Sequence, residues 1–254
     1  MKQLADKTIF ITGGASGIGS ACVQAYLSAG AKVFVMDKDE QALERMLRTG
    51  VPGLGGFKGD VSKGPDVAAA LQHALDLFGN LDSIHNNAGI SSPSKAIDDT
   101  TEDEWDLLMN VNLKSIYWTT KYGISLLKKN KGSILNTSSM TGEMGQSLHA
   151  VYTASKGAIN ALTKSMALDY AAAGVRVNAI APAGVWTPLL RQWADQQSDS
   201  AQITTYLNEI HALGYCPEGD VVADVAVFLL SDAARFVTGC IMPVSGGAEL
   251  GYKK

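Results

Sequence analysis

The sequence lacks the residue patterns that mark several protein classes. Its 254 residues include only three cysteines, Cys22, Cys216 and Cys240, which lie far apart and have neither disulfide-framework nor metal-ligand spacing. The four histidines form no HxxxH or HExxH pair, so we expect no catalytic metal. An odd number of scattered cysteines is typical of free thiols in a reducing compartment, which favours a cytoplasmic protein.

Long apolar runs and clusters of basic residues are also missing. No stretch approaches the ~18 consecutive apolar residues that span a bilayer, and the first seven residues contain no apolar segment of a signal peptide. The net charge is −4, and no group of lysines or arginines forms a basic patch. These absences argue against membrane and nucleic-acid partners.

What is present is an alternation of short β-branched runs with longer helical patterns, without repeats or a linker. The predicted strands are Thr8–Thr12, Lys32–Asp37, Gly56–Val61, Leu81–Asn86, Ser133–Thr137, Arg176–Ala181 and Ile241–Val244. The predicted helices are Gly19–Ala29, Val67–Phe78, Glu102–Lys129, Val151–Ala173 and Val221–Leu230. This alternation predicts an α/β fold in a single domain over residues 1–254: a Rossmann-like, doubly wound parallel sheet of about seven strands with helices on both faces.

Two local patterns refine this prediction. Thr101 and Glu104 form the T-x-x-E pattern of a capping box, which predicts the start of a helix. Residues 188–215 break the alternation, because they are rich in polar residues and have only weak helical periodicity. A long insertion between a strand and a helix is often a binding lid, so we expect this segment to cover the substrate.

A glycine-rich turn, Thr-Gly-Gly-Ala-Ser-Gly-Ile-Gly over residues 12–19, follows the first predicted strand. Its glycines permit a tight turn and let backbone N–H groups approach a pyrophosphate at the N-terminus of the next helix. Glycine turns also serve as plain connections between a strand and a helix. The turn therefore needs a second signal before it predicts a dinucleotide.

Asp37 provides that second signal. It closes the second predicted strand, 18 residues after Gly19, where an acidic residue can bind the ribose hydroxyls of a dinucleotide. A carboxylate there would repel the 2′-phosphate of NADP, and Ser16 adds no basic charge to the glycine turn. We therefore predict NAD as the cofactor. Lys38 is the one opposing signal, since a lysine could attract that phosphate.

Tyr152 and Lys156 are four residues apart, so both lie on one face of a predicted helix. A free tyrosine has a pKa of ~10, and a nearby cation lowers it by favouring the phenolate. Tyr117 and Lys121 have the same spacing, so the context must decide between the two pairs. Ser139 lies 13 residues before Tyr152, after a predicted strand end where parallel sheets bind ligands. The pair at 117 and 121 has no such hydroxyl and is interpreted as ordinary helix surface.

These motifs are joined by Asp60-Val61, Asn86-Asn87-Ala88-Gly89, Asn112 and Thr187. Together they occur in the order and spacing of the short-chain dehydrogenase/reductase family, which the chain resembles over essentially its whole length. The resemblance implies that Tyr152 is the general acid/base, that Lys156 modulates its pKa and binds the ribose, and that Ser139 donates to the substrate oxygen. It also implies that Asn112 lies in a helix distortion and holds a water molecule of a proton relay. The alternative for Asn112 is a buried amide satisfied by the backbone.

The resemblance further implies which positions bind the cofactor and how the chain assembles. The cofactor-binding positions are Gly13, Ser16, Gly17, Ile18, Gly19, Asp37, Asp60, Val61, Asn87, Ala88, Gly89, Tyr152, Lys156, Pro182, Val185 and Thr187. The family usually has Pro-Gly after the sixth strand, where this chain has Pro-Ala-Gly at 182–184, and alanine is less permissive than glycine, so we expect the conformation of this loop to differ from that of the family. The implied assembly is a homotetramer in which the helix at 151–173 packs against its symmetry mate.

The predicted function is therefore an NAD(H)-dependent oxidoreductase that interconverts a secondary alcohol and a ketone by hydride transfer. Polar residues near the phenol and in the lid (Glu143, Gln146, His149, Arg191, Gln192 and His211) favour a small polyol, sugar or hydroxy acid. The predicted substrate contacts are Ser139, Gln146, His149 and Tyr152.

Three alternatives stay open. Apolar residues of the same two segments (Met140, Met144, Trp186, Leu189, Leu190 and Trp193) could instead line a slot for a hydroxysteroid. The chain could be a catalytically silent NAD-binding protein that acts through interactions. It could also carry out enoyl reduction or epimerisation on the same scaffold, which the complete Ser–Tyr–Lys set makes a weaker hypothesis.

Overall fold

The structure is a computed structural model that describes residues 2–195 and 200–251. Within these ranges it does not describe the side chains of Leu189, Gln192, Trp193, Ser200 and Ala201. Residues 196–199 of the predicted lid, and the side chains of Leu189, Gln192 and Trp193 that were predicted to face the substrate, therefore lie outside the described part. Among the described helices, none combines the length and the hydropathy needed to span a bilayer.

Seven parallel strands form one sheet in the order β3-β2-β1-β4-β5-β6-β7. They are β1 (Thr8–Thr12), β2 (Lys32–Asp37), β3 (Leu54–Lys58), β4 (Ser83–Asn86), β5 (Ser133–Thr137), β6 (Arg176–Pro182) and β7 (Ile241–Val244). The strand order reverses between β1 and β4, which is the switch point where doubly wound sheets bind ligands. The predicted fold class is confirmed.

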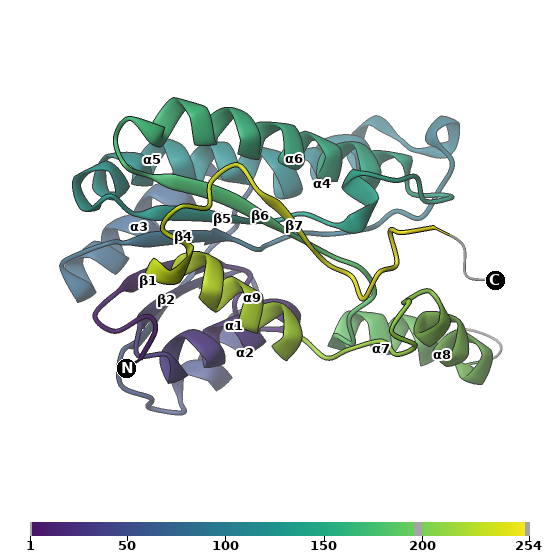
Figure 1. Cartoon of the computed structure of the whole chain (residues 1–254), viewed down its shortest axis with the longest axis horizontal. Helices are drawn as coiled ribbons and strands as arrows, with labels where there is room; N and C mark the ends of the chain where they lie inside the picture. The colour runs from purple at the N-terminus through teal and green to yellow at the C-terminus, as the bar shows by residue number, and fades with distance from the viewer. Residues whose placement is uncertain (1, 196–199, 252–254) are drawn as a thin grey trace.

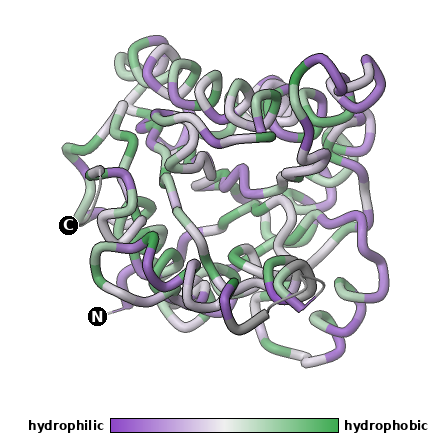
Figure 2. The backbone as a smooth tube through the Cα atoms, turned by 90° about the vertical axis from the view of Figure 1, so that its right-hand side faces the viewer, coloured by the Kyte–Doolittle hydropathy of each residue, from purple (hydrophilic) through white to green (hydrophobic). Residues whose placement is uncertain are grey.

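Helices cover both faces of the sheet (Figure 1). One layer contains α1 (Gly17–Ser28), α2 (Glu40–Leu47) and α9 (Asp220–Leu230), and the other contains α3 (Gly64–Phe78), α4 (Glu102–Met109), α5 (Ser115–Asn130) and α6 (Ala150–Ala171). The helices α7 (Pro188–Asp195) and α8 (Ser200–Glu209) lie apart from both layers, beside one end of the sheet (Figure 1). The layer helices carry hydrophobic and hydrophilic residues in turn (Figure 2), as expected for helices that bury one side only.

The core consists of two apolar clusters, one on each side of the sheet. Ile9 and Ile11 of β1 pack into the cluster under α1 and α9, whereas Phe10 between them packs into the cluster under α3, α5 and α6. All three side chains are fully buried. This alternation with period two, buried on both faces, explains why the parallel strands appear as continuous apolar runs in the sequence.

Several predicted elements differ from the structure, most of them by one to three residues at an end. The third strand ends at Lys58 rather than Val61, because the Asp60 carboxylate accepts hydrogen bonds from the backbone and hydroxyl of Ser62 and turns the chain. The fourth strand begins at Ser83 rather than Leu81, because the carboxylate of Asp82 accepts a hydrogen bond from the backbone N–H of Thr8. The long helix predicted for 102–129 is interrupted by a π-helical turn over Asn110–Lys114. The helix α2 was not predicted.

Candidate active site

The predicted site residues gather where the strands of the sheet end. The glycine turn follows β1, Asn87 to Gly89 follow β4, Ser139 follows β5, and the segment 182–187 ends β6 and leads into α7. Carboxyl ends of neighbouring parallel strands lie along one edge, so these segments, which are distant in the sequence, face one crevice at the switch point. Tyr152 and Lys156 reach this crevice from the first turns of α6.

The glycine turn fits tightly against the segment after β4. Gly13 has a φ of +63°, and a Cβ at this position would lie 2.8 Å from the Cα of Ala88. A Cβ at Gly19 would lie 2.0 Å from the carbonyl oxygen of Gly13 and 2.6 Å from Nδ2 of Asn87. No other residue type fits either place, which leaves the backbone itself as the surface at the start of α1. Ser16 is exposed at the N-cap of this helix, and its side chain makes no capping hydrogen bond.

Thr12 and Asn87 brace this turn from below. The hydroxyl of Thr12 accepts hydrogen bonds from the backbone N–H groups of Asn87 and Ala88, both at 3.1 Å. The side-chain amide of Asn87 donates to the carbonyl oxygen of Gly13 at 2.9 Å. The side chain of Asn87 thus fixes the glycine turn against the segment after β4.

Asp37 lies at the end of β2 beside the glycine turn. Its carboxylate accepts one hydrogen bond from the backbone N–H of Ala15, at 2.9 Å, and one from that of Asp39, at 3.0 Å. These bonds fix the carboxylate and leave lone pairs for ribose hydroxyls. Lys38 is exposed, and Asp60 and Val61 follow β3 on the neighbouring strand. The predicted adenosine-binding residues are therefore neighbours in space.

Lys156 lies beneath the ring of Tyr152, with its Nζ 5.5 Å from the ring centroid. The ammonium donates to the carbonyl oxygen of Thr137 at 2.9 Å, and burial lowers the pKa of Lys156 to about 8. Burial also raises the pKa of Tyr152, and the side-chain hydrogen bond with Ser139 opposes this rise. In the protein without a bound cofactor, burial thus has the larger effect on the pKa of Tyr152, and the lowering of this pKa by Lys156 stays a prediction.

The hydroxyl of Ser139 is held by a residue that the sequence analysis did not identify. Its Oγ accepts hydrogen bonds from the backbone N–H of Thr141 at 3.2 Å and from the hydroxyl of Thr141 at 3.0 Å. With both lone pairs occupied, the proton of Ser139 is directed at Tyr152 or at a substrate oxygen. In the sequence, Thr141 could be recognised only as a hydroxyl residue two positions after Ser139. This spacing is common to many turns, so it does not single out a functional residue.

Asn112 lies in the π-helical turn, so the predicted helix distortion is present. Its Oδ1 accepts from the backbone N–H of Ile90 at 2.8 Å, and its Nδ2 donates to the carbonyl oxygen of Ile90 at 2.9 Å and to Ser155 Oγ at 3.1 Å. The structure thus shows Asn112 as a buried amide that is hydrogen-bonded to the backbone, which was the alternative interpretation. The relay role implied by the resemblance stays a prediction.

The segment after β6 closes the other side of the crevice. Pro182 and Val185 are buried, and the hydroxyl of Thr187 accepts the backbone N–H of Leu190 at 3.2 Å where α7 begins. A Cβ at Gly17 would lie 3.3 Å from Cγ2 of Thr187, so this segment approaches the glycine turn. Ala183 does not adopt a positive φ, and the Pro-Ala-Gly departure therefore introduces no backbone strain there.

The predicted substrate residues differ in whether their polar groups already have partners within the protein. Gln146 is exposed in the loop before α6. His149 lies beside Tyr152, with ring centroids 6.3 Å apart, but its Nε2 is 3.0 Å from Ser94 Oγ and its Nδ1 is 2.9 Å from the carbonyl oxygen of Ser147. Both ring nitrogens are thus already used within the protein. Contact of His149 with a substrate stays a prediction.

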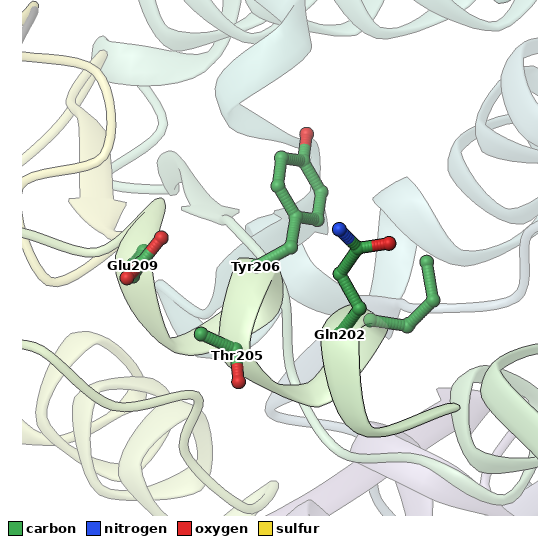
Figure 3. Close-up of a pocket in the computed structure, with 5 residues that line it drawn as sticks. Gln202, Thr205, Tyr206 and Glu209 are labelled. Atoms are coloured by element: carbon green, nitrogen blue, oxygen red, sulfur yellow. The ribbon is translucent and has the colours of Figure 1, made fainter. Parts of the chain in front are cut away.

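The lid residues are also anchored. Arg191 pairs with Glu218 and stacks on the ring of Trp186, with its guanidinium carbon 5.0 Å from the ring centroid. His211 is buried, and its Nδ1 bonds the carbonyl oxygen of Leu207 at 2.8 Å. One side of α8 lines a surface depression that the sequence analysis did not predict (Figure 3). The residues that line it are Gln202, Ile203, Thr205, Tyr206 and Glu209.

Comparisons with known proteins agree with this geometry. Residues 13–249 match the family model described as "Enoyl-(Acyl carrier protein) reductase". The chain is 40% identical over 246 residues to L-fucose dehydrogenase of Mus musculus, covering 97% of this chain and 89% of that protein.

Solved structures give the same result. The chain is similar to the 3-ketoacyl-(acyl-carrier-protein) reductase from Brucella melitensis complexed with NADH, with a TM-score of 0.90, 31% identity, and coverage of 97% of this chain and 99% of that one. It is also similar to the aldohexose dehydrogenase of Thermoplasma acidophilum, with a TM-score of 0.90, 30% identity, and coverage of 100% and 98%.

Proposed function

This chain belongs to the short-chain dehydrogenase/reductase family, and we propose that it is an NAD(H)-dependent dehydrogenase that interconverts a secondary alcohol and a ketone of a small sugar or polyol. The observation that carries the proposal is the grouping of Ser139, Tyr152 and Lys156 at the end of β5, next to the glycine turn at the end of β1. A proton-transfer group beside a dinucleotide site is what this reaction requires.

The residues present fit NAD. Gly13 and Gly19 leave no room for a side chain, so the backbone N–H groups at the start of α1 are open to a pyrophosphate. The fixed carboxylate of Asp37 suits ribose hydroxyls and repels a 2′-phosphate. When bound, the nicotinamide supplies or accepts the hydride and, in its oxidised form, adds a positive charge beside the phenol.

Residues of the chain itself transfer the proton in this reaction. Tyr152 takes the hydroxyl proton of the alcohol, or returns it to the ketone, while the directed hydroxyl of Ser139 donates a hydrogen bond to the same oxygen. Lys156, with a pKa of about 8, keeps an ammonium near the ring that stabilises the phenolate and can exchange protons near neutral pH. Asn112 links α6, which carries Tyr152 and Lys156, to the loop after β4 through its hydrogen bonds with Ser155 and with the backbone of Ile90.

The polar rim favours a hydroxylated substrate. Glu143 and Gln146 are exposed on the loop that leads to Tyr152, and an apolar ligand would leave such groups unpaired. Two similar proteins are named for sugars, L-fucose and aldohexoses. Met140, half-buried in the turn after Ser139, and the exposed Met144 keep a hydroxysteroid as the second candidate substrate.

We extend the proposal to the lid, assembly and location. Residues 188–215 close over the substrate as part of a single domain spanning 1–254. The protein assembles as a homotetramer. Two features support this: a groove between α5 and α6 that includes Leu113, Tyr117 and Leu162, and the outer edge of strand β7, which follows a loop with the fully exposed Phe236. The three cysteines are free thiols, which suits the cytoplasm.

A panel assay tests the proposed function. Formation of NADH is followed with L-fucose, aldohexoses, linear polyols and hydroxysteroids, each with NAD and with NADP. We expect the highest kcat/KM with a sugar or polyol and NAD. The variant Gln146→Leu should reduce kcat/KM on that substrate by about tenfold and on cyclohexanol by less than about twofold. Turnover of hydroxysteroids alone, of enoyl thioesters alone, or of none of these would reject the proposal.

A further inference from the structure

A series of hydrogen-bonded polar side chains lies below the candidate active site, and the roles above do not use its members His85 and Tyr26. His85 of β4 is fully buried, with its Nδ1 2.9 Å from the hydroxyl of Tyr26 and its Nε2 2.9 Å from the hydroxyl of Thr137. Tyr26 of α1 is also fully buried and hydrogen-bonds Cys22 one turn earlier. Polar groups in an apolar cluster are costly unless all are satisfied, so this series is not incidental packing.

The direction of these hydrogen bonds follows from Asn87. Its Nδ2 donates to the carbonyl oxygens of Thr12 at 3.2 Å and Gly13 at 2.9 Å, so its Oδ1 is the atom that faces Thr137. An amide oxygen only accepts, and the hydroxyl of Thr137 therefore donates to it, at 3.4 Å. Having given its proton to Asn87, Thr137 must accept from His85.

His85 consequently carries its proton on Nε2 and accepts at Nδ1 from the hydroxyl of Tyr26. Burial keeps the ring neutral, since it lowers the pKa of His85 to about 3. Each ring nitrogen has one partner of the correct kind, so a single tautomer and ring orientation satisfies the whole series.

The series ends at both halves of the site. The carbonyl oxygen of Thr137 accepts the ammonium of Lys156 at 2.9 Å, and Asn87 holds the carbonyl oxygen of Gly13 in the glycine turn. We infer that His85 is a positioning residue: its Nε2–H tautomer holds Thr137, and through Thr137 it sets the Lys156 ammonium and the Asn87 brace of the glycine turn. The kinetic consequences rest on the proposed function, whereas the tautomer and the cofactor affinity do not.

Ser83 offers a matched control. It lies two residues before His85 on β4, is buried, and its hydroxyl is 2.9 Å from that of Ser133 on β5. Ser83→Ala therefore removes a buried hydrogen bond between the same two strands, but at the end remote from the site. A purely structural role of His85 predicts similar behaviour of variants at both positions.

The first test is spectroscopic. Nitrogen-15 NMR of the histidine-labelled full-length protein should show the neutral Nε2–H tautomer for His85 at pH 7, assigned by the loss of its signals in His85→Leu. Tyr26→Phe removes the donor to Nδ1 and should produce a mixture of tautomers. An Nδ1–H tautomer or a charged ring at pH 7 in the wild type would overturn the inference.

The second test is functional. For His85→Leu we expect NADH to bind about fivefold or more weaker by fluorescence and kcat to fall about tenfold or more, with the KM of the alcohol changed less than about twofold. His85→Gln can still donate and accept, and should recover most of both losses. Ser83→Ala should stay within about twofold of wild type in all three quantities.

Each outcome decides between the hypotheses. If His85→Leu and Ser83→Ala behave alike at equal folded fraction, the positioning role is refuted. If His85→Leu does not fold, Tyr26→Phe takes its place, because it keeps the ring and should still weaken NADH binding. If the wild type turns over no alcohol, the proposed function fails, while the tautomer and the NADH affinity still test the inference.

Discussion

At the scale of single residues, burial shifts the titrating groups more than charge pairing does. Burial lowers the pKa of Lys156 to about 8 and that of His85 to about 3, and it raises the pKa of Tyr152. The phenol therefore needs a further positive charge to work near neutral pH, and the oxidised nicotinamide provides one. The protein prepares the acid–base group, and cofactor binding completes it.

Asp37 should determine the choice between NAD and NADP. We expect the wild type to prefer NAD in kcat/KM by at least about tenfold, equivalent to ~1.4 kcal/mol. Asp37→Ala removes the repulsion of the 2′-phosphate and should narrow this ratio, mainly by improving NADP. A wild type that prefers NADP would show instead that the exposed Lys38 selects the cofactor.

His85 should make the protein sensitive to acid. Its folded pKa of about 3 lies below the ordinary value of 6.5, so below pH 6.5 the unfolded chain binds a proton that the folded protein does not. This contribution to the free energy of unfolding is complete above pH 6.5 and is lost progressively as the pH falls toward 3.

Urea unfolding at pH 7 and at pH 5 measures this effect. From pH 7 to pH 5, the wild type should lose roughly 2 kcal/mol more of its free energy of unfolding than His85→Leu does. Equal losses in the two proteins would mean that His85 titrates normally in the fold.

Residues with chemistry of their own were predictable from the sequence, and the residues that orient them were not. Tyr152 and Ser139 stood out because their spacing and position after a strand repeat a known pattern. Thr141, which holds Ser139, and Thr137, which holds Lys156 through a carbonyl oxygen, act by tertiary contacts. A backbone carbonyl has no signature in the sequence, since every residue carries one.

At the scale of elements, the capping box predicted at Thr101 and Glu104 is confirmed, with both reciprocal hydrogen bonds present. Thr101→Ala should cost about 1 kcal/mol and lower the melting temperature by roughly 2–4 °C. Glu104→Gln keeps the reciprocal bond and loses only the pair with Lys95, so it should lower the melting temperature less than Thr101→Ala does. An unchanged melting temperature in Thr101→Ala would show that tertiary contacts alone start α4.

The strands were predicted more accurately than the turns. β1, β2, β5 and β7 have the predicted bounds. For β1, β2 and β5 the reason is burial on both faces, which makes such strands short apolar runs in the sequence. The end of β3 was misplaced, since Val61 continues the apolar run while the Asp60 side chain turns the chain. The π-helical turn was not predictable from helical periodicity, because its cause is the pairing of Asn112 with the distant backbone of Ile90.

At the scale of the whole molecule, assembly should follow from the exposed apolar surfaces. Sedimentation velocity should show a tetramer for the wild type. Phe236→Asp should give dimers, because a charge on the exposed loop that precedes the edge strand β7 disfavours one of the two interfaces. Leu77 is also exposed but lies on α3, away from both surfaces, and Leu77→Asp should remain tetrameric. A monomeric wild type would contradict this assembly.

The central claim is that Tyr152 transfers the proton in an NAD-dependent dehydrogenation, and two phenol-to-phenyl variants test it most directly. Tyr117 also pairs with a lysine four residues on, Lys121 at 3.1 Å, but it lies on the exposed face of α5. Tyr117→Phe should keep the kcat of wild type, whereas Tyr152→Phe should lower kcat by 10²–10⁴-fold and leave NADH binding nearly unchanged. A Tyr152→Phe enzyme that retains more than about a tenth of the wild-type kcat would contradict the account.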